Sequence, residues 1–366
     1  MNITDRLERL VPSRVRELVP YRVEESEGLL KLDAMENPYD FPPQLIDAWM
    51  SRLAGTGLNR YPDPAARTLR KELLQLWGLG SDFGVVLGNG SDELIHMLCL
   101  CFARGEQSSV LCPAPSFAVY RIAAEAVGMR FETVPLREAD FSLDLDAMLA
   151  ACEKHQPSLV FLASPNNPTA NAFSVSDLVQ ICEQTPGLVV LDEAYYRFAG
   201  RSEIELLRSH ENLVVMQTFS KIGLAGLRVG MLYGNQAWVE LLERVRMPYN
   251  LGTLAQEGAL FALEHADVFE EQISRIIAER GRLSIGLRQL RDLKVWPSVT
   301  NFLLLRTPPG QGTAIFDSLK ARRILVKSLS GAHPFLQDTL RVTVGTRDEN
   351  DLLLAALEAA ISPSRL

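Results

Sequence analysis

Residues 213–228, LVVMQTFSKIGLAGLR, decide the fold of this chain of 366 residues. The apolar run at 213–216 leads into Ser220 and Lys221, and a glycine-containing stretch follows up to Arg228. A short, continuous run of aliphatic residues is typical of a strand buried on both faces, as in a largely parallel sheet. The stretch therefore predicts a buried strand that ends in a polar turn.

Four other apolar runs have the same form. They lie at residues 85–87, 109–111, 159–162 and 188–191, and they lead into GNGSDE, CPAPSF, SPNNPTA and DEAYY. Helical patterns separate them, for example at 92–103 and 176–183. Strands that alternate with helices predict an α/β domain with a mostly parallel sheet flanked by helices. Unusual segments at the carboxyl ends of the strands predict a binding site at that edge of the sheet.

The character of the chain changes after Pro248. Long amphipathic helices are expected at 256–263 and 268–290, followed by an α+β pattern that ends in a helix from Asp348. The strands of this pattern are expected near 301–306, 324–326 and 339–344. We expect a large domain at residues 46–254, and a smaller α+β domain at 255–366 with an N-terminal arm at 1–45. Four prolines and little regular pattern in the arm suggest a strap over the small domain and the cleft.

Composition excludes several classes of protein. The net charge of -8 gives no general attraction to nucleic acid or to an anionic membrane surface. The five cysteines form no CxxC pair and have no histidines clustered near them, so no metal site is expected. No signal peptide is recognisable, and no apolar run reaches the roughly 18 residues of a membrane span. We expect a cytoplasmic protein that binds small molecules.

The strand ends carry the groups that pyridoxal 5'-phosphate requires. That cofactor needs a lysine for its aldehyde, an anion for its pyridine nitrogen, a donor for its ring hydroxyl and a cup for its phosphate. Lys221 is the candidate for the catalytic lysine, since small residues beside it allow close approach. Asp192, directly after a strand, is the candidate anion, and Tyr195 is the candidate donor.

The phosphate cup is expected where a strand runs into a helix. Gly90, Ser91 and Asp92 stand at this junction, where backbone amides and the helix dipole favour an anion. Ser220 and Arg228 would complete the cup, with Arg228 as a bidentate donor. Phe117 is the candidate that stacks on the cofactor ring.

With these motifs in place, the chain resembles the fold-type I aminotransferases and, within them, the histidinol-phosphate aminotransferases. SPNNPT, DEAY and SK…GLRVG, in this order, carry the first resemblance. KLDAMENPY at 31–39, NRYPD at 59–63 and LRVTVGT at 340–346 carry the second. The resemblance covers essentially the whole chain and implies transfer of an amino group between L-histidinol phosphate and 2-oxoglutarate in histidine biosynthesis.

The resemblance also implies roles for further residues. Asn167 would share the ring hydroxyl with Tyr195, and Tyr61 would reach the cofactor phosphate of the other subunit in a homodimer. Arg341 would hold the carboxylate of glutamate or the phosphate of histidinol phosphate, and Tyr21 and Lys327 would assist with the substrate phosphate.

The chain departs from the family pattern at three positions. Ala170 stands where a glycine usually ends SPNNPTG, Phe117 where many relatives have tyrosine, and Lys327 where arginine is frequent. Lysine is a point charge without the fork of arginine, so the departure at Lys327 bears on phosphate recognition.

The alternatives to this function are a pyridoxal-phosphate-dependent threonine-phosphate decarboxylase, an aromatic amino acid aminotransferase and the sensing domain of a transcription regulator. The last would need a DNA-binding segment for which only about 40 residues precede the large domain.

Overall fold

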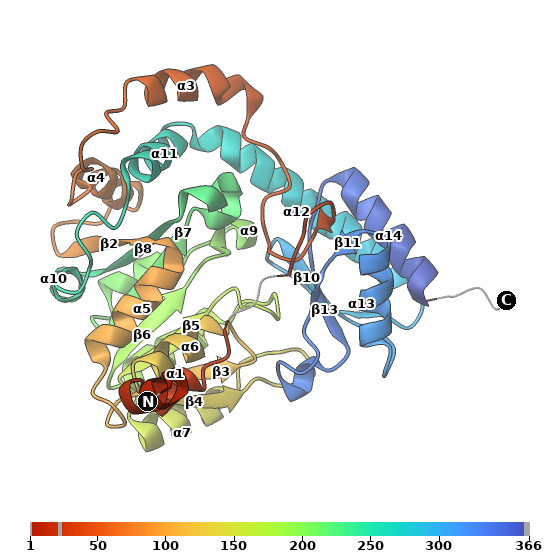
Figure 1. Ribbon diagram of the computed structural model, residues 1–366, viewed down its shortest axis with the longest axis horizontal. Coiled ribbons are helices and arrows are strands. Elements are labelled where there is room, and N and C mark those ends of the chain that lie inside the picture. Colours follow the sequence, from red (N-terminus) through yellow and green to blue (C-terminus); the bar gives the residue numbers. More distant parts are fainter. Residues whose placement is uncertain (1, 21–23, 362–366) are drawn as a thin grey trace.

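The computed structural model describes residues 2–20 and 24–361, and within these ranges the strands form three sheets (Figure 1). The largest has seven strands in the order β2-β8-β7-β6-β5-β3-β4. Their bounds are β2 Phe83–Asn89, β3 Ser109–Ala114, β4 Arg130–Pro135, β5 Leu159–Ala163, β6 Leu188–Asp192, β7 Leu213–Thr218 and β8 Val229–Asn235. The α/β class expected from the sequence is confirmed.

One strand of this sheet runs against the others. β8 pairs antiparallel with β2 and with β7, whereas the other neighbouring pairs are parallel. The carboxyl ends of β2, β7, β6, β5 and β3 therefore meet at one edge, and β8 begins there. The sequence patterns did not predict β4 or β8. β4 is an edge strand with exposed positions, and β8 carries Gly230 and Gly234, which interrupt its apolar pattern.

The buried strands are continuously apolar because both of their faces are covered. Val160 and Leu162 pack into one core cluster, while the intervening Leu159 and Phe161 pack into another. Helices on one face are α5 Gly90–Phe102, α6 Val119–Ala126 and α10 Gln236–Glu243. Helices on the other are α4 Arg67–Leu76, α7 Leu145–His155 and α8 Val175–Gln184.

A smaller sheet and its helices form the C-terminal part. Its strand order is β12-β13-β10-β9, and a two-stranded parallel pair, β1 with β11, lies beside it. The strands are β1 Leu30–Lys31, β9 Lys294–Val295, β10 Phe302–Arg306, β11 Ile324–Leu325, β12 Lys327–Ser328 and β13 Thr339–Thr343. The other α-helices after residue 45 are α3 Ile46–Ala54, α9 Tyr196–Ala199, α11 Thr253–Glu264, α12 Ala266–Gln289, α13 Gly312–Ala321 and α14 Arg347–Ile361. In residues 2–20 and 24–361, no helix has the length and apolar character needed to cross a bilayer.

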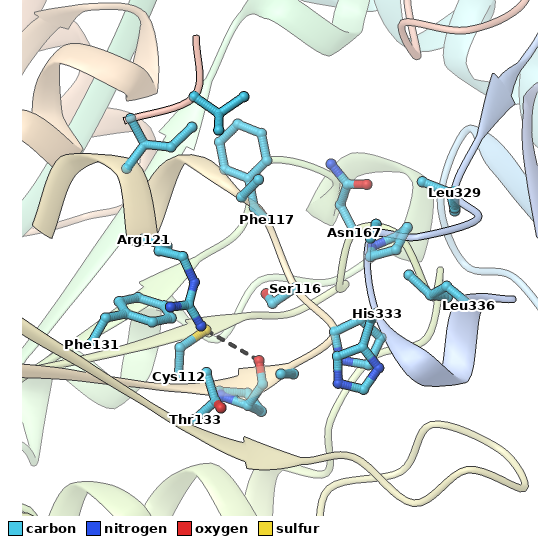
Figure 2. Close-up of a pocket in the computed structure, with 18 of the residues that line it drawn as sticks. Cys112, Ser116, Phe117, Arg121, Phe131, Thr133, Asn167, Leu329, His333 and Leu336 are labelled. Carbon is cyan, nitrogen blue, oxygen red and sulfur yellow. Dashed lines mark hydrogen bonds between the residues drawn. The ribbon is translucent and has the colours of Figure 1, made fainter. Parts of the chain in front are cut away.

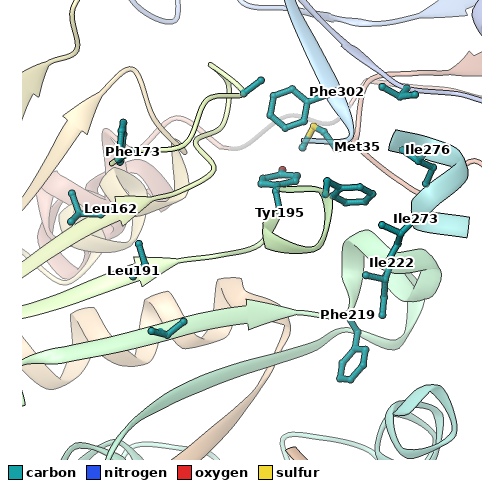
Figure 3. Close-up of a cluster of buried hydrophobic side chains, with 14 of the residues drawn as sticks. Met35, Leu162, Phe173, Leu191, Tyr195, Phe219, Ile222, Ile273, Ile276 and Phe302 are labelled. Atoms are coloured by element: carbon teal, nitrogen blue, oxygen red, sulfur yellow. The ribbon is translucent and has the colours of Figure 1, made fainter. Parts of the chain in front are cut away.

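A shared hydrophobic core joins the two parts (Figure 3). Tyr195, which follows β6, packs edge-on against Phe302 of β10 with ring centroids 5.1 Å apart. Ile273 and Ile276 of α12 belong to the same cluster as Ile222, which follows β7. The small sheet is thereby held against the edge where the parallel strands end.

The N-terminal arm differs from the expectation of little regular structure. It contains α1 Ile3–Leu10 and α2 Ser13–Arg16. Asn2 and Asp5 form a capping box that accounts for the start of α1.

α2 packs against α6 of the large sheet, whereas the later part of the arm contacts the small part. β1 pairs with β11, Met35 donates to Thr343 Oγ1 at 3.0 Å, and Asp40 accepts from Gln272 at 2.9 Å. The first helices thus lie on the large sheet, and residues 24–40 run along the small part as expected.

Candidate active site

A cavity of about 460 Å³ lies at the carboxyl edge of the large sheet, and we call it the inner cavity. Most of the site residues expected from the sequence line it, although they come from distant parts of the chain. These are Ser91, Asp92, Phe117, Asn167, Asp192, Tyr195, Ser220, Lys221, Arg228, Lys327 and Arg341. Gly90 lies directly beside it, at the start of α5.

Lys221 enters the inner cavity from a short π-helical turn, Ser220–Leu224, that follows β7. Its Nζ lies 3.5 Å from the carbonyl oxygen of Ala34 and 5.8 Å from the centre of the Tyr195 ring. Loss of water around the amine lowers the pKa of Lys221 to about 8, and the charge of Arg341 acts in the same direction. A larger fraction of the amine is therefore neutral and nucleophilic than in an ordinary lysine.

Asp192 ends β6 and is buried. Its Oδ2 accepts a hydrogen bond of 2.6 Å from the Tyr120 hydroxyl, and its Oδ1 accepts one of 3.0 Å from the Ala194 amide. Burial raises the pKa of Asp192 to about 6, although both hydrogen bonds oppose that shift. The carboxylate is thus placed to meet a cation or an N–H group of a bound ring.

The expected phosphate cup forms where β2, α5 and β8 meet. Arg228 donates a hydrogen bond of 3.0 Å to Asp92 Oδ2 and lies 3.5 Å from Ser220 Oγ. Gly90 has a φ of +77°, and a Cβ there would collide with the guanidinium of Arg228. Because the Asp92 carboxylate already faces Arg228, Asp92 can serve an anion only through its backbone N–H.

Arg341 and Asn167 form a second polar pair at the rim of the inner cavity. Arg341 is buried and donates from Nη1 to Asn167 Oδ1 at 2.6 Å and from Nη2 to the carbonyl oxygen of Asp33 at 2.7 Å. Since the oxygen of Asn167 is turned to Arg341, its Nδ2 donors are the ones available to a ligand oxygen. The sequence motifs did not indicate that Asp33 would position Arg341.

A larger cavity of about 670 Å³, the outer chamber, adjoins the inner cavity (Figure 2). Phe117, Asn167, Lys327 and Arg341 line both. Its other walls come mostly from residues 17–20, 112–118 and 328–336 and from α6 and β4, which contribute Arg121, Ile122, Glu125, Phe131 and Thr133. The chamber thus lies between the arm, the large sheet and a loop of the small sheet.

Two basic side chains of the outer chamber were not foreseen from the sequence. His333 faces the chamber, and its Nδ1 accepts a hydrogen bond of 3.2 Å from the Phe335 amide. Burial lowers the pKa of His333, which favours the neutral ring. Because Nδ1 accepts a hydrogen bond, Nε2 carries the proton of that ring. Arg121 also lines the chamber and lies 4.6 Å from the centre of the Phe131 ring. Neither residue belongs to a motif that could have singled it out.

One of the expected residues lies elsewhere. Tyr61 does not line either cavity; it is 80% exposed and stacks on Tyr249 with ring centroids 4.4 Å apart. Tyr21 lies outside the described residues. Among the residues that the structure does describe, no group of three or more metal-ligating side chains is found.

Comparison with known proteins gives the family. The model of the class I and II aminotransferases matches residues 27–357. Histidinol-phosphate aminotransferase 2 of Nitrosococcus oceani is 50% identical over 355 residues, which cover 97% of this chain and 98% of the relative. The histidinol-phosphate aminotransferase of Chromobacterium violaceum is 44% identical over 352 residues, covering 96% and 98%.

A solved structure agrees with the sequence relatives. The crystal structure of histidinol-phosphate aminotransferase from Sinorhizobium meliloti, in complex with pyridoxal-5'-phosphate, superposes with a TM-score of 0.86 at 25% identity. The match covers 96% of this chain and 97% of that one. The fold-type I resemblance drawn from the motifs is confirmed. The chain therefore belongs to the class I and II aminotransferases and, within them, to the histidinol-phosphate aminotransferase family.

Proposed function

We propose that this chain transfers the amino group of L-histidinol phosphate to 2-oxoglutarate, with pyridoxal 5'-phosphate as cofactor, in histidine biosynthesis. The products are imidazole acetol phosphate and L-glutamate. The observation that carries the proposal is the nearly full-length match to histidinol-phosphate aminotransferases. The cavity geometry supports it, because a lysine of lowered pKa lies between a buried carboxylate and a pair of arginines.

The inner cavity fits the cofactor in charge and in space. The orphan amides at the start of α5, together with Arg228, form a cradle for a phosphate. Because Gly90 has no side chain, the Arg228 guanidinium can lie against the backbone at the start of α5. Asp192 would face the ring nitrogen, Asn167 and Tyr195 the ring hydroxyl, and Phe117 one face of the ring. Ser220 and Arg228 would grip the phosphate together with the amides of Ser91 and Asp92, whereas the Gly90 amide donates to the Arg228 carbonyl oxygen at 2.9 Å.

The residues divide the chemistry among themselves. When bound, pyridoxal phosphate supplies an aldehyde that takes up the amino group and a ring that withdraws electrons from the neighbouring carbon. Lys221 would hold the aldehyde until the substrate amine displaces it. Its freed Nζ would then carry a proton from the substrate carbon that bears the amine to the C4′ carbon of the cofactor. Asp192 keeps the ring nitrogen protonated by its negative charge.

The substrates would enter through the outer chamber. Arg341 offers a guanidinium to the glutamate carboxylate or to the phosphate of histidinol phosphate, one after the other. Lys327 lies at the boundary of both cavities and adds a second cation, and Tyr21 would add a hydroxyl. A phosphate monoester carries close to two charges near neutral pH and needs several such donors.

We also propose that the active unit is a cytoplasmic homodimer in which Tyr61 completes the cofactor site of the other subunit. The exposure of Tyr61 and its distance from the cavities of its own chain support this, as do exposed apolar neighbours such as Leu58, Met247 and Leu254. The five free cysteines suit a reducing compartment. In this scheme residues 46–254 are the large domain, and residues 1–45 and 255–366 form the arm and the small domain.

Complementation tests the shared site. Tyr61→Phe and Lys221→Ala chains are mixed under conditions of proven subunit exchange. If Tyr61 acts across the interface, each mixed dimer has one site with both defects and one intact site, so activity returns. Absence of recovery would assign Tyr61 to its own subunit.

A half-reaction screen tests the substrate. The absorbance of bound cofactor is followed after addition of histidinol phosphate, histidinol, threonine phosphate or phenylalanine. We expect histidinol phosphate to convert the cofactor to its amine form at least about a hundredfold more efficiently than histidinol, since two or more charged hydrogen bonds depend on the phosphate. Equal rates would favour an aromatic aminotransferase. Release of carbon dioxide from threonine phosphate, without the amine form, would favour a decarboxylase.

A further inference from the structure

Tyr120 is a fully buried tyrosine in the first turn of α6, beneath the inner cavity. Its ring stacks on Phe161 of β5, with centroids 4.5 Å apart and planes inclined by 13°. Its edge contacts Phe117 at 5.6 Å and 88°. A hydroxyl carried into such a core needs a hydrogen-bond partner, and that partner identifies the role of the residue.

The partner is the Asp192 carboxylate. Tyr120 donates to Oδ2 at 2.6 Å, a short distance typical of a hydrogen bond to an ionised acceptor. The Ala194 amide donates to Oδ1 at 3.0 Å. Because the two donors come from different segments and bind different oxygens, they fix both the rotation and the tilt of the carboxylate.

We propose that Tyr120 is a positioning residue, whose hydroxyl holds Asp192 in the orientation in which the carboxylate meets the ring nitrogen of the cofactor. The proposal rests on the cofactor role given to Asp192 above. It also explains why a tyrosine, and not a purely apolar residue, occupies this core position. Through its contact with Phe117, the same side chain supports the ring that is expected to stack on the cofactor.

The charge state of Asp192 depends on the same contact. Burial raises the pKa of Asp192, whereas the hydrogen bonds from Tyr120 and Ala194 lower it. Across the cavity, Asp92 raises this pKa and Lys221 lowers it. Cys112 and Tyr195 are the other titratable groups that interact with this cluster. Without the Tyr120 hydroxyl, the carboxylate should therefore take up a proton at a higher pH.

Tyr120→Phe removes the hydroxyl and keeps the ring contacts. The dissociation constant of pyridoxal phosphate is measured by equilibrium dialysis of the full chain, as wild type, Tyr120→Phe, Asp192→Asn and the double variant. We expect a loss of affinity of about tenfold or more for Tyr120→Phe and a larger loss for Asp192→Asn. The double variant should match Asp192→Asn within about twofold, because the hydroxyl acts through the carboxylate.

Two further measurements separate positioning from a general structural effect. Tyr233→Phe is the matched control, since Tyr233 is also fully buried but does not contact Asp192. The affinity of this variant for pyridoxal phosphate should stay within about twofold of wild type. Between pH 5 and 9, the fall in affinity on acidification should begin at a higher pH in Tyr120→Phe than in wild type. Unchanged affinity in Tyr120→Phe, or losses that multiply in the double variant, would overturn the proposal. If Asp192→Asn alone left the affinity unchanged, the cofactor role of Asp192 would fail first.

Discussion

The inner cavity and the outer chamber adjoin each other, yet the protein builds them differently. In the inner cavity, Asp192 ends a central strand and Lys221 and Arg228 lie in the connection between β7 and β8. Tyr120 donates a hydrogen bond of 2.6 Å to Asp192, and Arg228 donates one of 3.0 Å to Asp92. The outer chamber has one wall from β3, β4 and α6, but its other walls are the arm and the loop between β12 and β13, which carries His333.

The difference separates two tasks of the enzyme. Groups at the ends of paired strands are already oriented by the sheet, as a site of fixed chemistry requires. Loops and an arm can change their sequence and position with little cost to the sheet, so they suit the choice of substrate. Arg341 and Lys327 line both cavities and connect the two tasks.

The largest effect should come from the inner cavity. Lys221→Ala should still bind pyridoxal phosphate but lose turnover by at least about 10⁴-fold, because both the nucleophile and the base are removed. The absorbance spectrum and the mass after borohydride reduction check this. A reduced adduct on another lysine would show that the catalytic amine lies elsewhere.

Arg341→Ala tests the residue that both cavities share. We expect both half-reactions, with glutamate and with histidinol phosphate, to slow by about ten- to a hundredfold, because each substrate loses hydrogen bonds from the same cation. Rapid-mixing measurements of each half-reaction give the two values. The exposed Arg322→Ala is a control with the same loss of charge. An effect on histidinol phosphate alone would mean that the glutamate carboxylate is held by another group.

Lys327→Ala should have a smaller and more selective effect. If Lys327 is the second cation proposed for the phosphate, the preference for histidinol phosphate over histidinol should shrink by about three- to tenfold. The ratio of kcat/KM for the two amines measures it. A preference identical to wild type would remove Lys327 from the phosphate site and leave Arg341 as its principal cation.

The smallest expected effect is on the pH dependence of cofactor capture, which tests whether Arg341 influences Lys221. With the pKa of Lys221 lowered to about 8, about one tenth of the molecules should carry a neutral Lys221 amine at pH 7. At an ordinary lysine pKa the fraction would be about one in three thousand. The rate at which the cofactor-free chain captures pyridoxal phosphate should rise with pH and level off above about 8. In Arg341→Ala the plateau should move to higher pH, since a neighbouring positive charge is gone. A plateau that stays in place would exclude electrostatic coupling between these side chains.

The sequence was most informative where the sheet positions the side chains. Lys221, Asp192 and Arg228 could be found because each stands near a strand end in a recognisable motif. Tyr120 could not be distinguished from an ordinary core residue of α6, because its function depends on a contact with Asp192, which is 72 positions away.

The outer chamber was less predictable for a physical reason. His333 and Arg121 carry no local pattern, and only the packing of separate segments brings them to one cavity. The helix α1 was missed although Ile3, Leu7 and Leu10 recur at helical spacing, and none of its 8 residues is buried. The role of Tyr61 depends on a second subunit and stays a prediction.

The reversed direction of β8 has a consequence for the synthesis of the protein. Arg228 and Asp92 are 136 positions apart and meet only after β8 has paired with β2. The ribosome must therefore release the chain through Asn235 before the phosphate cradle can close, and β2 remains without its partner until then. Pairings of such sequence separation form slowly and leave strands exposed to aggregation. The cofactor can bind a complete cradle only after this pairing, so its capture marks a late stage of folding.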